Sequence, residues 1–253
     1  MPITTDSVRT YYDENTNLFL KFSGTKKAQN IHRSLWMQDT KTLEDALDTS
    51  NALIKAEIES IAPNNARIAD LGCGVGASLF YIYPRLQNPA PALGLTLSPV
   101  QAKLAGNSAA QLGLQEQINF AEGDFTSVPL PSESLDAVYS VEAVCHAVDP
   151  EKYFREASRL LRKGGKLILV DDYQAARPFS ANETKWLKAY IDGWYVPGVR
   201  TIEQVISFAN KNGLQLKKNE ELTPHLRLRN LPDLLASTLL FLGEKLPIKH
   251  AIV

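Results

Sequence analysis

The residues best suited to chemistry follow a short apolar segment in the first third of the chain. The stretch from Ala66 to Ser78, ARIADLGCGVGAS, places an acidic residue, Asp70, just before three glycines at alternate positions, Gly72, Gly74 and Gly76. Glycine has no Cβ, so a backbone built from it can approach a ligand closely and adopt positive φ angles. This stretch therefore predicts a tight turn that forms one wall of a ligand pocket.

The spacing of the turn indicates which ligand it suits. G-C-G-V-G differs from the G-x-G-x-x-G pattern that wraps a diphosphate, and the Asp70 carboxylate would repel a diphosphate but suits an ammonium group and hydroxyls. A strand over Arg67 to Leu71, the turn, and a helix over about Ala77 to Leu86 would open a nucleotide pocket. These residues resemble the first motif of the class I S-adenosylmethionine-dependent methyltransferases. An ordinary tight turn is the alternative for this motif taken alone.

The ends of later strands supply residues that the resemblance assigns to the same cofactor. Asp124 and Phe125 resemble the pair that binds adenine, although a solvated loop aspartate is the alternative. GLTLSPVQAKLA, from Gly94 to Ala105, is similar to methyltransferases acting on carbon, including the sterol, tocopherol and cyclopropane-forming groups. This similarity implies that Thr96 and Gln101 serve the ribose, where an NAD site would want a carboxylate. The predicted cofactor-binding residues are Asp70, Gly72, Gly74, Thr96, Leu97, Gln101, Asp124, Phe125 and Val141.

The segment SVEAVCH, from Ser140 to His146, follows a predicted strand beside the expected position of the methyl group. It resembles the S-x-E-A-x-C-H stretch of sterol C-methyltransferases, which implies that Glu142 acts as base or cation stabiliser with His146 as its partner. An alkene acceptor develops a carbocation, which carboxylates and aromatic faces can stabilise. The alternatives are that Glu142 caps a helix and that His146 is a satisfied core histidine.

The N-terminal pattern from Tyr11 to Trp36 looks like that of bacterial C-methyltransferases that methylate prenyl diphosphates. The resemblance implies an isoprenoid acceptor, in the first place farnesyl or geranyl diphosphate. A diphosphate would need a local cationic pocket, commonly with Mg²⁺, although no metal ligand set is certain. The predicted acceptor-binding residues are Tyr11, Tyr12, His32, Arg33, Trp36, Trp186, His225 and Arg227.

Other functions remain open at this point. The basic residues near His225 equally fit the solvated face of a strand, and most aromatic residues at helical spacing belong to a core. The alternatives are an O- or N-methyltransferase of a small natural product, a C-methyltransferase of a sterol-like lipid, and a non-catalytic module that retains the cofactor pocket.

The elements that must position these residues alternate between strands and helices. Such alternation predicts an α/β fold, a Rossmann-like, doubly wound, mostly parallel sheet, with ligands at the carboxyl ends of the strands. The expected later strands are Pro91–Leu97, Ile118–Ala121, Leu135–Val141, Lys166–Asp171 and a sixth, Leu214–Leu222; no seventh is convincing. The expected later helices are Val100–Leu112, Pro150–Leu161 ended by Arg162 to Gly165, Asn182–Tyr195, Thr201–Asn212 and Leu231–Leu246.

The N-terminal part precedes the first core strand. Short helical or apolar patches at Ser7–Asp13 and Thr16–Phe22, with a helix over Thr42–Ile61 stopped by Pro63, predict a helical lid. We therefore expect residues 1–62 to form a cap on the acceptor side and residues 63–253 to form the domain that binds S-adenosylmethionine.

Composition narrows the class of protein. The 253 residues are 44% hydrophobic and carry 27 Lys plus Arg against 28 Asp plus Glu, so the near-zero net charge offers no bulk field for nucleic acid. Cys73 and Cys145 provide neither a disulfide framework nor a metal set. No apolar run approaches the roughly 18 residues of a membrane span. We expect a cytoplasmic protein with a small-molecule substrate, whose assembly into a homo-oligomer is left open.

Overall fold

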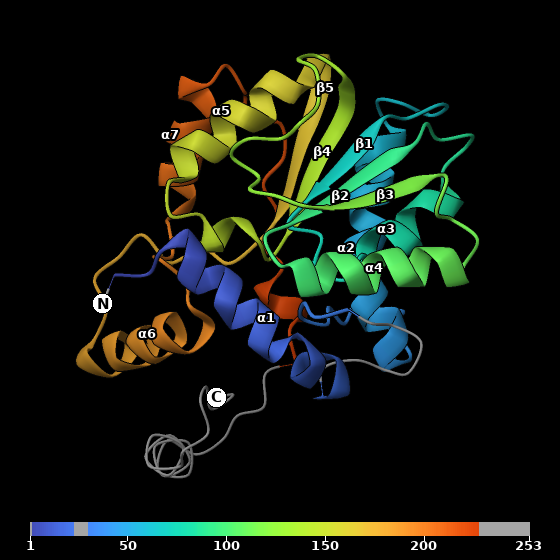
Figure 1. Ribbon diagram of the computed structural model, residues 1–253. Helices are drawn as coiled ribbons and strands as arrows, with labels where there is room; N and C mark the ends of the chain where they lie inside the picture. The colour runs from blue at the N-terminus through green and yellow to red at the C-terminus, as the bar shows by residue number, and fades with distance from the viewer. Residues whose placement is uncertain (1, 23–29, 228–253) are drawn as a thin grey trace.

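The computed structural model describes residues 2–22 and 30–227, and its centre is a parallel β-sheet (Figure 1). The five strands lie in the order β3-β2-β1-β4-β5, which is the arrangement of a doubly wound α/β fold and confirms the predicted fold class. Their bounds are β1 (Ile68–Leu71), β2 (Ala92–Thr96), β3 (Ile118–Glu122), β4 (Leu135–Val141) and β5 (Leu161–Val170).

The first strand occupies the middle of this sheet. Asp70 lies opposite Gly94 of β2 on one side and opposite Tyr139 of β4 on the other. The chain moves outward from β1 in one direction through β2 and β3, and in the other through β4 and β5. The order of the strands therefore reverses beside Asp70, which is where sheets of this kind form a ligand crevice.

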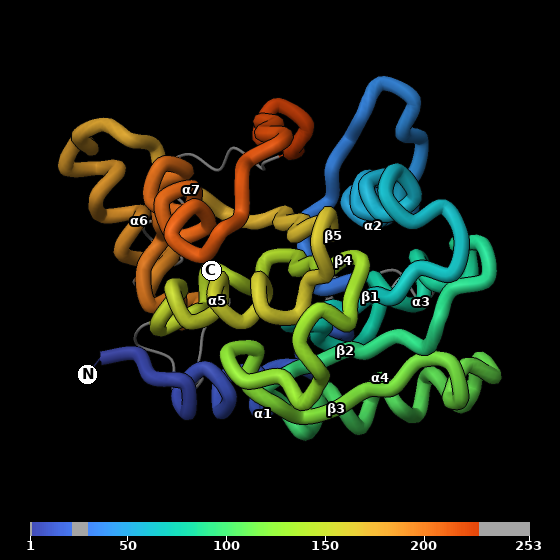
Figure 2. The backbone as a smooth tube through the Cα atoms, turned by 90° about the horizontal axis from the view of Figure 1, so that it is seen from above, coloured from blue at the N-terminus to red at the C-terminus, as the bar shows by residue number. Residues whose placement is uncertain are grey.

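Helices cover both faces of the sheet (Figure 2). α2 (Leu43–Glu59) and α3 (Ala77–Ile82) lie on one side, while α5 (Pro150–Leu160) and α7 (Ile202–Lys211) lie on the other. α4 (Pro99–Gln111) packs against β3 and β2. Short 3-10 turns cover Tyr83–Arg85, Val144–His146 and Thr223–His225. None of the helices within residues 2–22 and 30–227 has the length and apolar character needed to cross a membrane.

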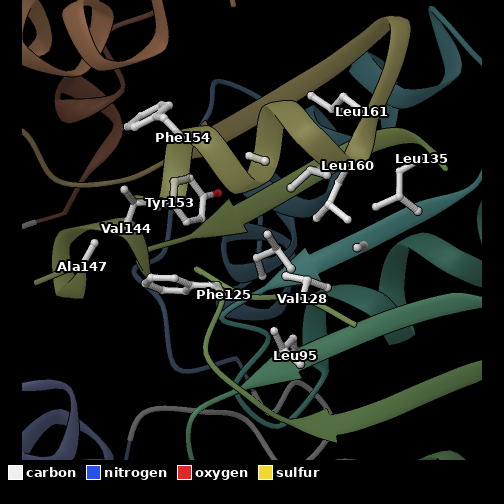
Figure 3. Close-up of a cluster of buried hydrophobic side chains, with 14 of the residues drawn as sticks. Leu95, Phe125, Val128, Leu135, Val144, Ala147, Tyr153, Phe154, Leu160 and Leu161 are labelled. Atoms are coloured by element: carbon white, nitrogen blue, oxygen red, sulfur yellow. The ribbon is translucent and has the colours of Figure 1, made fainter. Parts of the chain in front are cut away.

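The core beneath α5 fixes the carboxyl end of β4 (Figure 3). Tyr153 and Phe154 are buried there, and the Tyr153 ring meets Phe125 edge-on at 5.1 Å. The Ser140 hydroxyl donates to the carbonyl of Leu71 at 2.6 Å, so it accepts the bond from the Tyr153 hydroxyl at 2.7 Å. These bonds tie the ends of β1 and β4 together directly beside the glycine turn.

Two further helices lie at the carboxyl end of the sheet, away from its two faces (Figure 1). α1 (Thr5–Phe22) is one continuous helix where we expected two patches, and it contacts α4. α6 (Ala181–Trp194) lies beside it, and the Tyr11 ring stacks on Tyr195 at 4.9 Å. α2 differs from α1 because its Ile54 and Ile58 belong to the buried core of the sheet. The boundary between a lid and a catalytic domain at residue 62 stays a prediction.

Two of the predicted elements differ in the structure, and a third lies outside the residues that the structure describes. No strand forms over Leu214–Leu222: Leu214 packs against the core beneath α5, but Leu216 is 51% exposed. Residues 162–165 do not end a helix, because α5 stops at Leu160 and the strand β5 already begins at Leu161. The helix expected at Leu231–Leu246 falls outside the described residues.

Candidate active site

A cavity of about 250 Å³ opens at the carboxyl ends of β1, β2 and β4. Its walls come from these strand ends, from α1 and α6, and from the segment that precedes α2. Most of the residues expected from the sequence meet there. Those that line the cavity are Tyr12, His32, Arg33, Asp70, Gly72, Gly74, Thr96, Leu97, Gln101, Phe125, Val141, Glu142 and His146.

The wall next to β1 combines a buried carboxylate with the glycine turn. Asp70 is only 2% exposed, and burial raises the pKa of its carboxyl to about 8. A Cβ on Gly72, at φ 91°, would lie 2.4 Å from the Cβ of Ala143, so packing requires glycine. Gly74 has φ 54°, and a Cβ there would meet nothing within 4 Å. A cationic group bound here would stabilise the ionised form of Asp70.

The end of β2 supplies a linked pair of polar side chains. The Thr96 hydroxyl donates to the carbonyl oxygen of the Gln101 amide at 2.7 Å, and both residues are buried. This contact fixes the orientation of the amide, whose nitrogen remains a hydrogen-bond donor for a ligand hydroxyl. Ser98 caps α4 by accepting the Gln101 N–H and also donates to Asp13 of α1. α1 is therefore attached to this part of the cavity.

Only one residue of the predicted adenine-binding pair lines the cavity. Phe125 lines the cavity, but Asp124 is absent from the lining residues. One carboxylate oxygen of Asp124 accepts both the N–H and the hydroxyl of Thr126, at 2.8 and 2.7 Å. The adenine-binding role of Asp124 stays a prediction.

Glu142 lies at the turn that leaves β4, with φ 46°, a conformation that few non-glycine residues adopt. Its Oε1 accepts the backbone N–H of Arg33 at 2.8 Å, and its Oε2 lies 3.7 Å from Arg33 Nη1. Burial raises the pKa of Glu142, and the charge of Arg33 partly opposes that rise. The carboxylate is thus held in one position and made more basic than a solvated glutamate.

Two further acidic residues, Asp171 and Asp172, hold this region in place, and the sequence motifs did not indicate a role for either. Asp171 accepts the backbone N–H groups of Ala143, Val144 and Cys145 with one carboxylate oxygen, at 2.7–3.3 Å. Asp171 therefore fixes the turn between Glu142 and the 3-10 helix, and burial raises its pKa to about 6.

Asp172, the next residue, lines the cavity and binds both Arg33 and Tyr190. Both of its carboxylate oxygens accept from Arg33 Nη1, at 2.5 and 2.6 Å, and one also accepts the Tyr190 hydroxyl at 2.6 Å. The sequence did contain a feature that could have indicated this role, namely two consecutive acidic residues directly after the fifth strand.

His146 does not partner Glu142, which corrects the pairing expected from the sequence. Its Nδ1 lies 3.3 Å from the carbonyl of Tyr195; a carbonyl only accepts, so Nδ1 carries the proton. Its Nε2 is then the acceptor for the Tyr12 hydroxyl at 2.7 Å. Burial lowers the pKa of His146 to about 4, which keeps the ring neutral. The catalytic roles of Glu142 and His146 stay predictions.

Aromatic side chains from α1 and α6 form one wall of the cavity. Tyr12, Tyr190 and Trp194 line it, and Phe19 stacks on Trp194 at 5.6 Å. Tyr11 does not line the cavity but supports its wall through the stack with Tyr195 described above. Trp186, which was expected in this set, does not line the cavity.

The expected residues Trp36, His225 and Arg227 form a separate cluster. The Arg227 guanidinium lies 3.6 Å from the centre of the Trp36 ring, and the backbone N–H of Trp36 donates to the backbone carbonyl of His225. None of the three lines the cavity. Across residues 2–22 and 30–227, no group of three or more His, Cys, Asp or Glu side chains could hold a metal ion.

A family model described as a methyltransferase domain matches residues 69–169, which include the glycine turn, the Thr96–Gln101 pair and Glu142. The match covers less than half of the chain, and it includes the motifs that resemble those of the class I S-adenosylmethionine-dependent methyltransferases. The residues that line the site fit S-adenosylmethionine, the cofactor of such domains. Asp70 would face the ammonium group of its methionine part, and Thr96 and Gln101 its ribose hydroxyls.

The curated proteins that this chain resembles are distant relatives. The tocopherol O-methyltransferase of Arabidopsis thaliana is 28% identical over 212 residues, which are 81% of this chain and 56% of that protein. The chain spans about half the length of the curated relatives that it matches.

Two solved structures share most of the fold. A 4+2 cyclase named SpnF has a TM-score of 0.74 at 25% identity, with 88% of this chain and 78% of that one covered. Geranyl diphosphate C-methyltransferase from Streptomyces coelicolor has a TM-score of 0.73 at 18% identity, with 89% and 86% covered. The second likeness concerns the fold alone.

Proposed function

We propose that this protein is a methyltransferase that transfers the methyl group of S-adenosylmethionine to an alkene carbon of an isoprenoid. The observation that carries the proposal is the Glu142 carboxylate, which lines the cavity beyond the glycine turn and is held by Arg33. An O- or N-acceptor needs at most a base, whereas an alkene also needs a fixed negative charge against its carbocation. A carboxylate fixed among aromatic rings supplies both.

The bound cofactor supplies an electrophilic methyl group on a sulfonium. The chain has to bring the alkene to about 3 Å from that methyl group and exclude water. The new C–C bond forms as the C–S bond breaks, and the positive charge passes to the neighbouring alkene carbon. Glu142 stabilises this charge and then accepts a proton from an adjacent carbon, which restores a double bond. Tyr12, Tyr190 and Trp194 line the cavity as aromatic faces that suit a cation.

The identity of the isoprenoid is the finer part of the proposal. A prenyl diphosphate such as farnesyl or geranyl diphosphate, with Mg²⁺, is supported by the shared fold of the Streptomyces coelicolor enzyme, whose structure holds Mg²⁺ and a geranyl diphosphate analogue. A sterol-like or tocopherol-like lipid is supported by the ion pairs of the cavity. Asp172 and Glu142 already balance the positive charge of Arg33, so this residue offers little attraction to a diphosphate. Both belong to the same proposed reaction.

Product analysis with methyl-labelled S-adenosylmethionine tests the proposal. The acceptors should include geranyl and farnesyl diphosphate with and without Mg²⁺, side-chain-unsaturated sterols, tocopherol precursors, and simple phenols and amines. We expect label in a new C–CH₃ group of an isoprenoid, identified by mass spectrometry and NMR.

Label only in methyl ethers or N-methyl products would replace the proposal with O- or N-methylation. Tight cofactor binding without transfer to any acceptor would favour a non-methylating role, as the name of the SpnF cyclase illustrates for this fold.

A further inference from the structure

The segment that enters α2 carries a buried amide with an unused oxygen. Asn30 is 2% exposed and lines the cavity. Its Nδ2 lies 3.5 Å from a carboxylate oxygen of Asp48, and since a carboxylate only accepts, this contact fixes which end of the amide is nitrogen. The Oδ1 atom at the other end is buried and has no hydrogen-bond partner among the described residues.

His32, two residues further, presents a second unused acceptor. Its Nδ1 lies 3.0 Å from the carbonyl of Arg33, so Nδ1 carries the proton and donates. In the neutral ring Nε2 is then a bare acceptor. Nε2 is buried, has no partner within the described part of the chain, and belongs to a residue that lines the same cavity.

Two unpaired acceptors beside one cavity point to a ligand that donates hydrogen bonds. Buried polar atoms without partners are rare in folded proteins, and each costs stability until a donor arrives. Asn30 and His32 line the cavity from the same segment as Arg33, and this segment is not one of the strand ends assigned to the cofactor. The donor therefore belongs to the acceptor molecule or to water bound with it.

We infer that the acceptor carries a hydroxyl group that donates to His32 Nε2, with Asn30 Oδ1 taking the second donor from a water or a further hydroxyl. This inference rests on the proposed function and refines it to an isoprenoid alcohol, which includes sterol-like lipids. A diphosphate presents only acceptors, which these two atoms would repel. An ammonium group would instead favour a free carboxylate, and both Glu142 and Asp172 are engaged by Arg33.

The test compares matched probes that differ only at the hydroxyl. Farnesol, farnesyl methyl ether, farnesylamine and farnesyl diphosphate would be titrated by calorimetry into the full chain saturated with S-adenosylhomocysteine, and a side-chain-unsaturated sterol would be compared with its 3-methyl ether. We expect the alcohol to bind about 10- to 100-fold more tightly than its ether, because the ether leaves the buried acceptors unpaired.

Variants assign the effect to these side chains. His32→Phe should bring the alcohol-to-ether ratio of dissociation constants to within about twofold, while His32→Gln, which keeps an acceptor oxygen, should retain part of it. Asn30→Ala should reduce the ratio less than His32→Phe. Asn119→Ala, at an exposed position of β3, is the matched control for Asn30→Ala and should leave the ratio unchanged. Binding of S-adenosylhomocysteine should be the same in all variants.

The outcomes separate this inference from the proposed function. Equal binding of alcohol and ether, stronger binding of the amine or the diphosphate, or an unchanged ratio in His32→Phe would overturn the hydroxyl site and assign the two acceptors to water alone. A preserved alcohol preference without any carbon methylation would overturn only the reaction. Carbon methylation of the diphosphate alone would overturn only the hydroxyl.

Discussion

The two halves of the cavity are built in different ways. The cofactor half comes from strand ends and what directly follows them, so the sheet positions Asp70 and Thr96, and Thr96 in turn holds Gln101 at the start of α4. The acceptor half is assembled from α1, the segment before α2, the turn after β4, Asp172 and α6. Its groups are positioned by side-chain contacts such as that of Arg33 with Asp172. The first half is thus a property of the fold, whereas the second can differ between proteins that share the fold.

The largest expected effect tests whether the acceptor half performs the chemistry. Glu142→Gln should reduce kcat by about 100- to 10,000-fold, because the amide neither accepts the proton nor offsets a carbocation. The dissociation constant of S-adenosylhomocysteine, measured by calorimetry, should not change. Glu133→Gln is a matched control, since Glu133 is an exposed glutamate that also has positive φ. Unchanged turnover in Glu142→Gln would remove this residue from the mechanism.

The next effect tests the cofactor half. Asp70→Asn should weaken S-adenosylhomocysteine binding by about 100- to 1000-fold, because a buried ammonium would lose its counter-charge. The melting temperature of the free protein should stay equal or rise, since burial already disfavours the charged form of Asp70. Asp39→Asn, at an exposed position, is the control. Weaker binding together with a lower melting temperature would indicate a structural role instead.

A pH dependence sharpens the same point. The pKa of Asp70 is raised to about 8 in the cofactor-free protein, and a bound ammonium should lower it. Binding should therefore release a proton at neutral pH, and affinity should rise about tenfold per pH unit from pH 6 towards pH 8. Above that range the amino group of the ligand itself, with an ordinary pKa of about 8, loses its charge. Calorimetry in buffers of different ionisation enthalpy measures the proton, and the absence of proton release would contradict the expectation.

The smallest effect concerns the contact between Arg33 and Glu142. Arg33 opposes the rise in the pKa of Glu142, so Arg33→Gln should raise that pKa further. If activity needs the carboxylate, the acid limb of the pH–kcat profile should move to higher pH by about one unit, with most of the activity recovered in alkaline buffer. Arg177→Gln, which breaks an exposed pair with Glu183, should leave the profile in place. A uniform loss at every pH would mean that Arg33 only holds the segment in place.

The positions of Asp70, Thr96 and Gln101 at the cavity could be predicted from the sequence, because each depends on residues close by along the chain. Thr96 and Gln101 are five residues apart, and the cap at Ser98 that begins α4 brings them into contact. The strand that ends at Leu71 and the glycines after it likewise gave the position of Asp70. Local spacing could not reveal that Asp124 would turn to its own neighbour Thr126, because a loop carboxylate has several donors within reach.

The acceptor half was predicted in composition but not in its pairing. Tyr12, Arg33, Glu142 and His146 were expected near the acceptor, and all four line the cavity. Their partners were missed: Tyr12 binds His146 across 134 residues of sequence, and Arg33 binds Asp172 across 139. Trp36, His225 and Arg227 instead lie together where an isolated antiparallel β-bridge between Leu35 and Leu226 joins their two segments.

The sequence alone determined that alternating strands and helices would form a parallel sheet, with Asp70 and its glycines at the reversal of strand order, because these features depend on neighbours along the chain. Only the tertiary structure decided that Arg33 would be held by two carboxylates, that His146 would turn to Tyr12, and that Asn30 and His32 would be left with unused acceptors. Contacts of this kind depend on how distant segments approach one another over the strand ends, which no local pattern encodes.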